Sequence, residues 1–429
     1  MVVPHRRRSA RARHSLAVDS SIVRQSAVEL DADYRVLTTA LDAHPGAQRL
    51  SEFAAATKQL SDWRNVAELA NWHSVEGPLF AMVARLKEPV MPSPLLRELR
   101  RSVARETVRT LFLKGRAREV CSALASADID VMGLKGIALV ERVYRDHSLR
   151  SMADVDLLVR LPDLERAYDI VVALGYHGPM DGRWKQGRRH APELSNNGGA
   201  AIVELHHHIV NGTHLASIEP MWERATPASD PADGFLVPSL EDLTFHVALH
   251  FSGDRMSMSQ KALRQLMDLG ETLRVADSTL DWDVVVREAK RFGHTRPLFF
   301  ALFAAHELTG AAVPADVLAA LVPDGYTDAV GVRFLARRVL TTEPWQPLEL
   351  LAARRQAARI LWNAVSPRRP KSLANQTDDV TSPTDRKRIA RGAKLLVKEL
   401  GAPHAVRTDF QLNRLLRPEG SQDRGVGPG

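Results

Sequence analysis

Apolar residues recur every three to four positions along residues 16–128. This spacing puts the apolar side chains on one face of a helix, so the region is predicted to be helical. Prolines that interrupt the pattern near residue 90 mark a connection between helices. The helical segments are AVELDADYRVLTTALDA, SEFAAATKQL, VAELANWHSV, PLFAMVARL and the long run LLRELRRSVARETVRTLFLKGRAREVCSALASA.

The same helical pattern returns along residues 238–365. It opens with SLEDLTFHVALHFS, in which Ser239 and Asp242 form a variant of the capping box that starts helices. The segments ALRQLMDLGETLRV, LDWDVVVREAKRFG and RPLFFALFAAHELTG continue it. One more helix is predicted at RIARGAKLLVKEL, within an otherwise loosely ordered C-terminal end.

Residues 129–237, between the two helical regions, have a different pattern. The short apolar runs IDVMGL, MADVDLLV and AAIVELHHHIV are typical of strands. IALVERVY and LPDLERAYDIVVALGY separate them with helical spacing, and Pro162 and Gly175 stand near the start and the end of the second helix. This alternation predicts a small α/β core with a mixed sheet, flanked by helices, in a protein of the α+β class.

Length and charge refine this organisation. The chain has 429 residues, which is more than one core usually organises, and 45% of them are hydrophobic, as in a globular protein. A net charge of +7 is concentrated at the two ends. The ends are interpreted as solvated tails, with attraction of a polyanion as the alternative. The predicted segments are a basic disordered head at 1–15, the helical region 16–128, the α/β core 129–237, the helical region 238–365 and a basic, largely disordered tail at 366–429.

Several classes of protein are excluded. No apolar run approaches the roughly 18 residues of a membrane-spanning helix, and no signal-peptide core follows the first basic residues. The sequence therefore predicts a cytoplasmic protein without a membrane partner. Cys121 is the only cysteine, so an internal disulfide and a cysteine-built metal site are excluded. Its helical, apolar surroundings favour a packing role over a nucleophilic one.

Two aspartates interrupt the strand MADVDLLV. Alternate side chains of a strand share a face, so Asp154 and Asp156 point one way with Leu158. Val155 and Leu157 point the other way, into a core. Two buried like charges repel, and their desolvation adds to the cost. A divalent cation offsets both penalties, and carboxylate oxygens suit Mg²⁺ or Mn²⁺, often together with substrate phosphates.

A third carboxylate and a glycine-containing turn complete the candidate chemistry. Glu204 lies in the run VELHHHI, where alternation puts His206 and His208 on its face. GLKG at 133–136 joins a predicted strand to a predicted helix, a place where backbone N–H groups bind phosphate. Its glycines permit close approach of a ligand, and its lysine supplies positive charge. The spacing is neither that of the Walker loop nor that of the dinucleotide fingerprint.

Together these segments resemble a bacterial family of uncharacterised nucleotidyltransferases within the polymerase-β-like nucleotidyltransferase superfamily. The resemblance covers roughly residues 110–310, and its most specific piece is L-K-G followed, some twenty residues on, by R-x-M-x-D-x-D-L-L-V. It is carried by GLKGIALVERVY, LRSMADVDLLV, LERAYDIVVALGY, HAPEL and IVELHHHI, with FHVALHFSG, ALRQLMDLGETL and LDWDVVVREAKRFG in the helical part.

The resemblance implies a metal-dependent enzyme that transfers a nucleoside monophosphate from a nucleoside triphosphate, most commonly ATP, and releases pyrophosphate. Asp154 and Asp156 match the superfamily's carboxylate pair that holds the catalytic Mg²⁺ or Mn²⁺. Glu204 matches the third carboxylate, a metal ligand or a base for the acceptor hydroxyl. The acceptor class is open between a small molecule, a protein or peptide side chain and an RNA end, and the oligomeric state is not predicted.

The resemblance also implies nucleotide-binding roles. Gly133, Lys135 and Gly136 fall at the superfamily's phosphate-binding turn, although most members carry a Gly-Ser or Gly-Gly pair there. Lys135 and Arg150 would stabilise the phosphates. His206 would contact the substrate.

Two alternatives remain. The histidine-rich runs HHH and HVALH point to a zinc hydrolase, but the H-E-x-x-H motif requires glutamate where Val247 stands. His250 is instead expected to be a hydrogen-bonded packing residue. The second alternative is a catalytically inactive nucleotide-binding or regulatory module whose helical flanks bind a protein. The three acidic positions argue against it, because unused buried carboxylates are costly.

Overall fold

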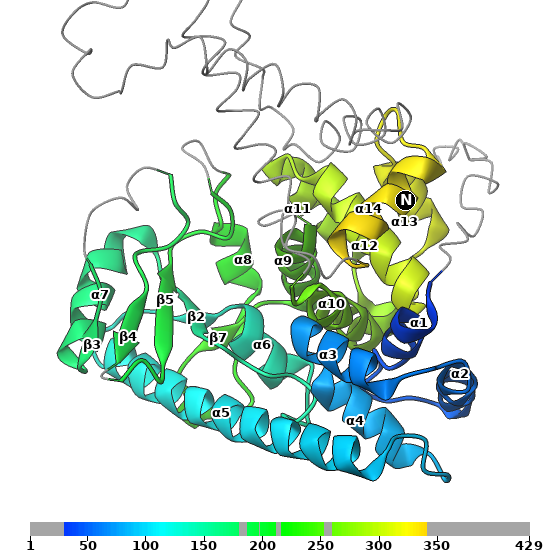
Figure 1. The fold of residues 1–429 in the computed structure, drawn as a ribbon. Coiled ribbons are helices and arrows are strands. Elements are labelled where there is room, and N and C mark those ends of the chain that lie inside the picture. The colour runs from blue at the N-terminus through cyan, green and yellow to red at the C-terminus, as the bar shows by residue number, and fades with distance from the viewer. Residues whose placement is uncertain (1–29, 180–186, 197, 212–215, 253–259, 341–429) are drawn as a thin grey trace, which may run out of the picture.

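The structure is a computed structural model that describes residues 30–179, 187–196, 198–211, 216–252 and 260–340. The predicted basic head, the tail and the helix at RIARGAKLLVKEL lie outside these residues. The described chain combines a mixed sheet with helices on either side of it in sequence, so the predicted α+β class is confirmed (Figure 1). Among the described helices, none combines the length and hydrophobicity required to cross a membrane.

From residue 30 on, where the structure describes the chain, the predicted first helical region is helical. Side-chain caps begin two of its helices: Asp31 accepts a hydrogen bond from the backbone of Tyr34, and Asp62 accepts one from Arg64. Within the described residues the helices of this region are α1 (Ala32–Thr39), α2 (Ala47–Thr57), α3 (Trp63–His73), α4 (Glu76–Arg85) and α5 (Ser93–Ala125).

The sheet has seven strands in the described residues, in the order β3-β4-β5-β2-β1-β7-β6. β2 pairs in parallel with β5 and antiparallel with β1, while β1 pairs in parallel with β7, so the sheet is mixed as predicted. The three predicted strands form its centre, and the edge strands are too short to have produced a sequence signal. The strands are β1 (Met132–Gly133), β2 (Val155–Leu158), β3 (Tyr176–His177), β4 (Leu194–Asn196), β5 (Ile202–His206), β6 (Thr226–Pro227) and β7 (Leu236–Val237).

The two faces of β2 have different surroundings. Val155 and Leu157 are fully buried in the core that the sheet forms with α5 and α7 (Leu164–Ala173). Leu158 points to the other face and belongs to the core of the helices. The predicted alternation is therefore confirmed for the residues within β2, whereas Asp154 precedes the strand.

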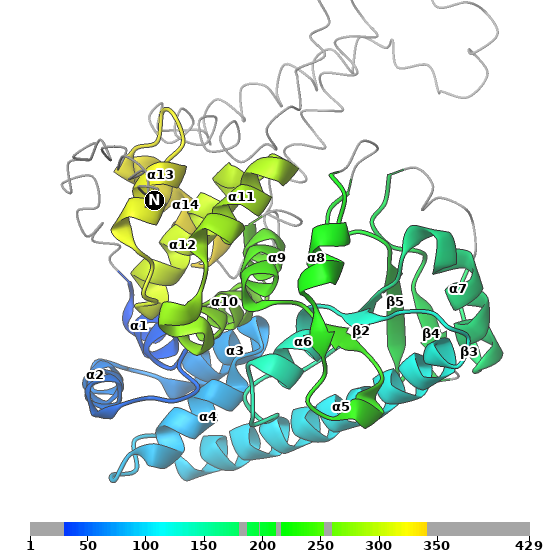
Figure 2. The same cartoon turned by 180° about the vertical axis from the view of Figure 1, so that it is seen from behind.

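Helix α5 takes part in both cores. Leu99, near its start, packs with the helices, whereas Leu113 and Cys121 pack beneath the sheet. Figure 1 and Figure 2 show α5 running along one edge of the molecule from α4 to the sheet. Burial raises the pKa of the Cys121 thiol to about 12, which agrees with the predicted packing role.

The second helical region packs around α9, which contacts α10, α11 and α12. Its predicted cap is present in altered form: the Asp242 backbone N–H donates to Ser239 Oγ at 3.2 Å, and Ser239 Oγ donates to the Asp242 carboxylate at 2.9 Å. The residues of this core also come from α1 to α4, so the two helical regions share one core. The helices are α9 (Leu240–Ser252), α10 (Ala262–Ala276), α11 (Trp282–Phe292), α12 (Thr295–Thr309), α13 (Ala315–Leu321) and α14 (Asp328–Arg338).

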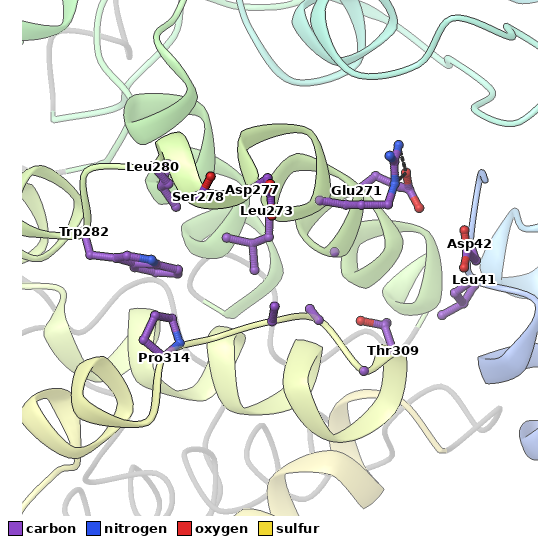
Figure 3. Close-up of a pocket in the computed structure, with 15 residues that line it drawn as sticks. Leu41, Asp42, Glu271, Leu273, Asp277, Ser278, Leu280, Trp282, Thr309 and Pro314 are labelled. Carbon is purple, nitrogen blue, oxygen red and sulfur yellow. Dashed lines mark hydrogen bonds and ion pairs between the residues drawn. The ribbon is translucent and has the colours of Figure 1, made fainter. Parts of the chain in front are cut away.

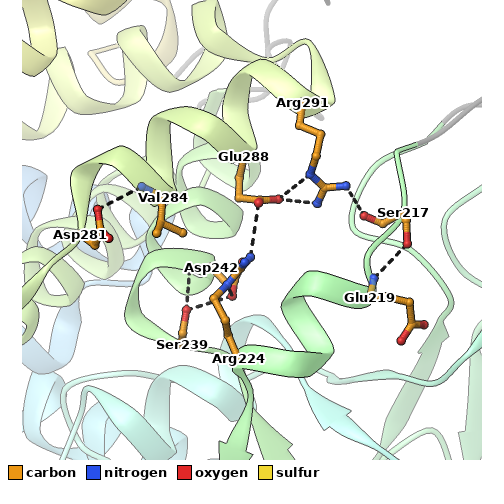
Figure 4. A network of polar contacts seen from close by, with 9 residues as sticks. All are labelled: Ser217, Glu219, Arg224, Ser239, Asp242, Asp281, Val284, Glu288 and Arg291. Atoms are coloured by element: carbon orange, nitrogen blue, oxygen red, sulfur yellow. Dashed lines mark hydrogen bonds and ion pairs between the residues drawn. The ribbon is translucent and has the colours of Figure 1, made fainter.

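A set of ion pairs, here called the helix network, joins α8 (Glu219–Arg224) to α9 and α11 (Figure 4). Arg224 donates to both oxygens of Asp242, at 2.8 and 2.6 Å, and lies 3.5 Å from Glu288. Arg291 donates to Glu288 and to the carbonyl oxygen of Ser217. Each buried carboxylate therefore faces an arginine, and the network fixes α8 against the helices.

Candidate active site

The centre of the sheet brings two of the predicted carboxylates together. Asp156 on β2 and Glu204 on β5 are direct neighbours in the parallel ladder, where strands lie about 4.8 Å apart. His206 follows Glu204 by two residues and shares its face. Lys135 begins α6 (Lys135–Arg142) one residue after β1, the other neighbour of β2. These four side chains are called the acidic cluster below.

Lys135 and His206 both contact the two acids. Lys135 Nζ lies 2.5 Å from Asp156 Oδ1 and 3.5 Å from Glu204 Oε2. His206 Nε2 lies 2.9 Å from the same Asp156 oxygen and 3.2 Å from the same Glu204 oxygen. The side chains of Asp156 and His206 are each 1% exposed, so these contacts are shielded from water.

The contacts set the protonation of the cluster. Burial alone raises the pKa of Asp156, but Lys135 and His206 outweigh it and hold that pKa well below its usual range. The pKa of Glu204 is also lowered, because the hydrogen bond to His206 and the charge of Lys135 outweigh burial and the charge of Asp156. Burial lowers the pKa of Lys135, but the two carboxylates outweigh burial and raise it. At neutral pH the cluster thus holds two carboxylates and one ammonium group.

Asp154 lies beside this cluster. Asp154 was predicted to share a strand face with Asp156, but it precedes β2, which begins at Val155. Strand alternation therefore does not fix the direction of its side chain. Burial raises the pKa of Asp154, and the charges of Asp156 and Glu204 raise it further, while Lys135 lowers it. Asp154 is therefore within electrostatic reach of the cluster, but its carboxylate does not belong to the group of atoms close enough to share one metal ion.

The donor set of the cluster fits a divalent cation. One ligand atom each of Asp156, Glu204 and His206 lies within 4.8 Å of the others. Carboxylate oxygens suit Mg²⁺ and Mn²⁺, and an imidazole nitrogen is accepted more readily by Mn²⁺. In the described residues His206 Nδ1 is buried without a hydrogen-bond partner. Lys135 Nζ contacts the same oxygens, so a metal ion would compete with an ammonium group there.

The turn GLKG is tightly packed. A Cβ atom on Gly133 would lie 3.1 Å from the ring of Phe235, and one on Gly136 would lie 3.3 Å from Arg150 Nη1. Close packing is thus one reason for both glycines. Lys135, between them, has a φ of 44°, a left-handed conformation that non-glycine residues seldom adopt. Backbone strain of this kind is concentrated at functional sites.

Arg150 is bonded within the protein. Its Nε and Nη2 donate to the two carboxylate oxygens of Asp268 on α10, at 3.1 and 3.0 Å, and its Nη1 donates to the Ser151 carbonyl at 2.5 Å. The hydroxyl of Tyr144 donates to the same carboxylate at 3.1 Å. These bonds anchor the segment before Asp154 to the helical half. A contact between Arg150 and phosphate stays a prediction.

Two further histidines lie close to β5: one packs on His206, and the other follows the end of the strand. His190, which the sequence did not place at the site, packs on His206 with 5.1 Å between the ring centroids. His208, predicted on the acidic face, follows the end of β5 and instead hydrogen-bonds the backbone of Val210 and Ala216. An imidazole that contacts backbone carbonyls is a structural element of this loop.

The histidines of α9 lie near the cluster without joining the donor group. Burial, together with the charge of Lys135, lowers the pKa of His246 to about 3 and holds that of His250 well below its usual range. His250 Nε2 lies 2.9 Å from Gln265 Nε2, as expected for a hydrogen-bonded packing residue. Both imidazoles are neutral at pH 7. The periodicity of α9 shows only that they share a helical face, not that they lie in electrostatic reach of Lys135 and Asp156.

A cavity of about 590 Å³ lies elsewhere, at the C-terminal end of α10 (Figure 3). Leu273, Trp282 and Pro314 form its apolar wall, and the ion pair of Glu271 and Arg274 lies at another side. Its lining contains no residue of the acidic cluster or of GLKG. The candidate chemistry therefore lies outside this cavity.

The amino-acid sequence was compared with those of known proteins and protein families. No curated protein matches the chain. The family described as uncharacterised nucleotidyltransferase matches residues 59–310, which include the sheet and the helices from α3 to α12. This match confirms the family predicted from the motifs. The chain belongs to this family of nucleotidyltransferases, and the protein is an enzyme of nucleotidyl transfer.

Proposed function

We propose that the protein transfers a nucleoside monophosphate from a nucleoside triphosphate, with ATP as the expected donor, to a hydroxyl group of an acceptor, with Mg²⁺ or Mn²⁺ as cofactor. The observation that carries the proposal is the pair of ionised carboxylates on β2 and β5, Asp156 and Glu204, with Lys135 Nζ against both. Buried charges are costly unless they are balanced. One lysine does not balance two acids, whereas a metal ion would.

The proposed metal-binding carboxylates are Asp156 and Glu204, with His206 beside them as a donor and a substrate contact. Asp154, in electrostatic reach of both acids, is proposed as a further ligand that would have to move towards the ion. A divalent cation held there would neutralise negative charge on the phosphates during transfer. The chain's own groups hold the surrounding atoms in place. Arg150 anchors the segment that carries Asp154, through its bonds to α10.

The proton and the leaving group follow from the charges of the residues. Glu204, which is ionised at neutral pH, accepts the proton of the acceptor hydroxyl. The acceptor oxygen forms a bond to the α-phosphorus, and the bond from this phosphorus to the oxygen of the β-phosphate breaks. Pyrophosphate leaves with that electron pair. Lys135 stabilises the phosphates, while Gly133 and Gly136 allow the tight turn that presents it.

Calorimetric binding of ATP, GTP, CTP and UTP, with and without Mg²⁺, tests the proposal. We expect metal-dependent binding of one or more nucleotides by the wild type and loss of that binding in the double variant Asp154→Ala/Asp156→Ala. Asp169→Ala, which removes an exposed carboxylate of α7 on the far side of the sheet, is the matched control.

The outcomes separate the proposed enzyme from the inactive module. Metal-dependent binding followed by release of pyrophosphate in the presence of an acceptor supports transfer. Nucleotide binding without any turnover across an acceptor screen favours a binding module. A folded wild type that binds none of the four nucleotides contradicts the proposed donor.

A further inference from the structure

Two cations lie at the start of α10, close to Asp154. Lys261 precedes the helix and Arg264 lies in its first turn. Nη1 of Arg264 is 3.5 Å from the carbonyl oxygen of Ser151, three residues before Asp154. The backbone N–H of Lys261 donates to the Trp72 carbonyl at 3.2 Å, so the position of this turn is fixed by α3.

These cations have no acidic partner of their own. Within the described ranges neither Lys261 nor Arg264 forms an ion pair with a carboxylate. Asp268, one turn further along α10, is already bonded by Arg150. Nε of Arg264 is buried and has no hydrogen-bond partner among the described residues. A buried guanidinium donor without an acceptor is costly, so the arrangement calls for an acceptor from outside the protein.

The electrostatics show the same imbalance. Burial and the charge of Arg150 lower the pKa of Arg264 to about 10. Burial and the charge of Arg264 lower the pKa of Lys261. Asp268 and Asp154 raise the pKa of Arg264, and Asp154 raises that of Lys261, yet both pKa values stay lowered, so burial and like charge outweigh these acids. Glu76 also interacts electrostatically with Arg264. A bound anion would relieve this repulsion.

The helix itself adds to the attraction. α10 has 15 residues, and its N-cap residue makes no side-chain capping bond; in the first turn, the backbone N–H of Leu263 donates to His73 Nδ1 at 3.5 Å. Lys261 stands at the N-cap with a φ of 65°, a left-handed conformation that seldom occurs in a lysine. The helix dipole favours anions at this end. The buried, unpaired Nε of Arg264 is an independent sign of a ligand here.

We propose that Lys261, Arg264 and the first turn of α10 form an anion subsite for the β- and γ-phosphates of the donor nucleotide. This inference rests on the proposed function and assigns the leaving pyrophosphate to residues outside the predicted phosphate turn. Lys135 begins α6 directly after β1 of the sheet, whereas Lys261 and Arg264 belong to the helical half. An oligophosphate would thus contact both halves of the protein, with Asp154 between the two sets of charges in electrostatic reach of each.

Titration calorimetry with inorganic pyrophosphate, with and without Mg²⁺, tests the subsite. Lys261→Asn keeps a residue that tolerates the left-handed backbone, and Arg264→Gln keeps a hydrogen-bond donor without the charge. Each should weaken pyrophosphate and nucleoside triphosphate binding about tenfold, the effect of one charged hydrogen bond, while binding of nucleoside monophosphate stays unchanged. Arg274→Gln, at the other end of α10, is the matched control and should change none of these affinities.

The subsite and the donor assignment can fail separately. Pyrophosphate binding that is absent in the wild type, or equal in Lys261→Asn, Arg264→Gln and the wild type, overturns the subsite. Triphosphate binding that needs Asp156 but neither Lys261 nor Arg264 also overturns the subsite and supports the proposed function. Pyrophosphate binding that needs Lys261, without any triphosphate binding by the wild type, supports the subsite and contradicts the proposed donor. If Arg264→Gln does not fold, Lys261→Asn alone decides the outcome.

Discussion

The acidic cluster and the helix network are both buried groups of charged side chains, but they differ in balance. In the helix network, Arg224 and Arg291 face Asp242 and Glu288, so two arginines meet two carboxylates (Figure 4). In the acidic cluster, Lys135 is the side chain with a permanent positive charge that meets the two carboxylates, and His206 shares hydrogen bonds with both and helps to lower their pKa values.

The difference separates a structural role from a functional one. A balanced network satisfies its own charges and needs nothing from outside, so it serves to hold α8 against α9 and α11. An unbalanced cluster costs stability in the isolated protein and gains it from a ligand of opposite charge. By this reasoning the excess of carboxylates on β2 and β5 fits a cation, and the excess of positive charge at the start of α10 fits an anion.

The largest expected effect is on catalysis at the acidic cluster. Asp156→Asn removes one of the two carboxylates while keeping the shape of the side chain. The rate of pyrophosphate release should fall at least about 10³-fold, because electrostatic stabilisation of the transferred phosphate is lost. A coupled pyrophosphate assay measures the rate, and far-ultraviolet circular dichroism checks the fold. Wild-type activity in this variant would show that Asp156 is not part of the site.

The helix network should respond in stability instead. Arg224→Ala leaves the buried Asp242 without its two-point partner, so the free energy of unfolding should fall by about 3 kcal/mol. Urea denaturation measures this loss, and triphosphate affinity of the folded variant should be unchanged. A loss below about 1 kcal/mol, or a large change in nucleotide affinity, would remove the distinction between the two groups.

Near the acidic cluster, a buried histidine should make the stability of the protein depend on pH. His246 has a pKa of about 3 in the folded protein, against an ordinary value of 6.5. Below pH 6.5 the unfolded chain binds a proton that the folded protein does not, so stability falls as the pH falls, until the folded pKa is reached. At pH 5 this histidine should account for a loss of about 2 kcal/mol, at about 1.4 kcal/mol per pH unit.

Denaturation of the wild type and of His246→Gln across pH 7.5 to 5 measures this contribution. The variant cannot take up the proton, so its stability relative to the wild type should improve on acidification by up to about 2 kcal/mol. Parallel profiles for the two proteins would mean that His246 is not held neutral beside Lys135.

A smaller effect is expected from the lysine of the cluster. Lys135→Met removes the ammonium group that competes for the oxygens of Asp156 and Glu204, so Mn²⁺ should bind about tenfold more tightly, a change of about 1.4 kcal/mol. Triphosphate should bind more weakly, since the phosphates lose a positive charge. Calorimetry with Mn²⁺ alone measures the first effect, and Lys58→Met, an exposed position, is the control. Unchanged or weaker Mn²⁺ binding would contradict the proposed overlap.

Much of the candidate site follows from local patterns. Period-two alternation along β2 and β5 indicates that Asp156 and Glu204 leave the core side of their strands, and a strand-to-helix turn carries Lys135. The family follows from the same motifs. Asp154 shows where this reasoning stops, because it precedes the strand and its side-chain direction depends on the segment that Arg150 ties to α10.

Periodicity and motif spacing are properties of neighbouring residues, so the main elements and the family could be predicted from the amino-acid sequence alone, as could the three candidate acidic residues. Four features depend on the tertiary structure: the parallel pairing of β2 with β5, the electrostatic reach of α9 to the acidic cluster, the bond of Arg150 to Asp268, and the placement of Lys261 and Arg264 in electrostatic reach of Asp154. The β2–β5 partners are 48 positions apart and Arg150 and Asp268 are 118 apart. Charges interact through space whatever their distance along the chain. The balance of buried charge, on which both proposals rest, therefore exists only in the folded protein.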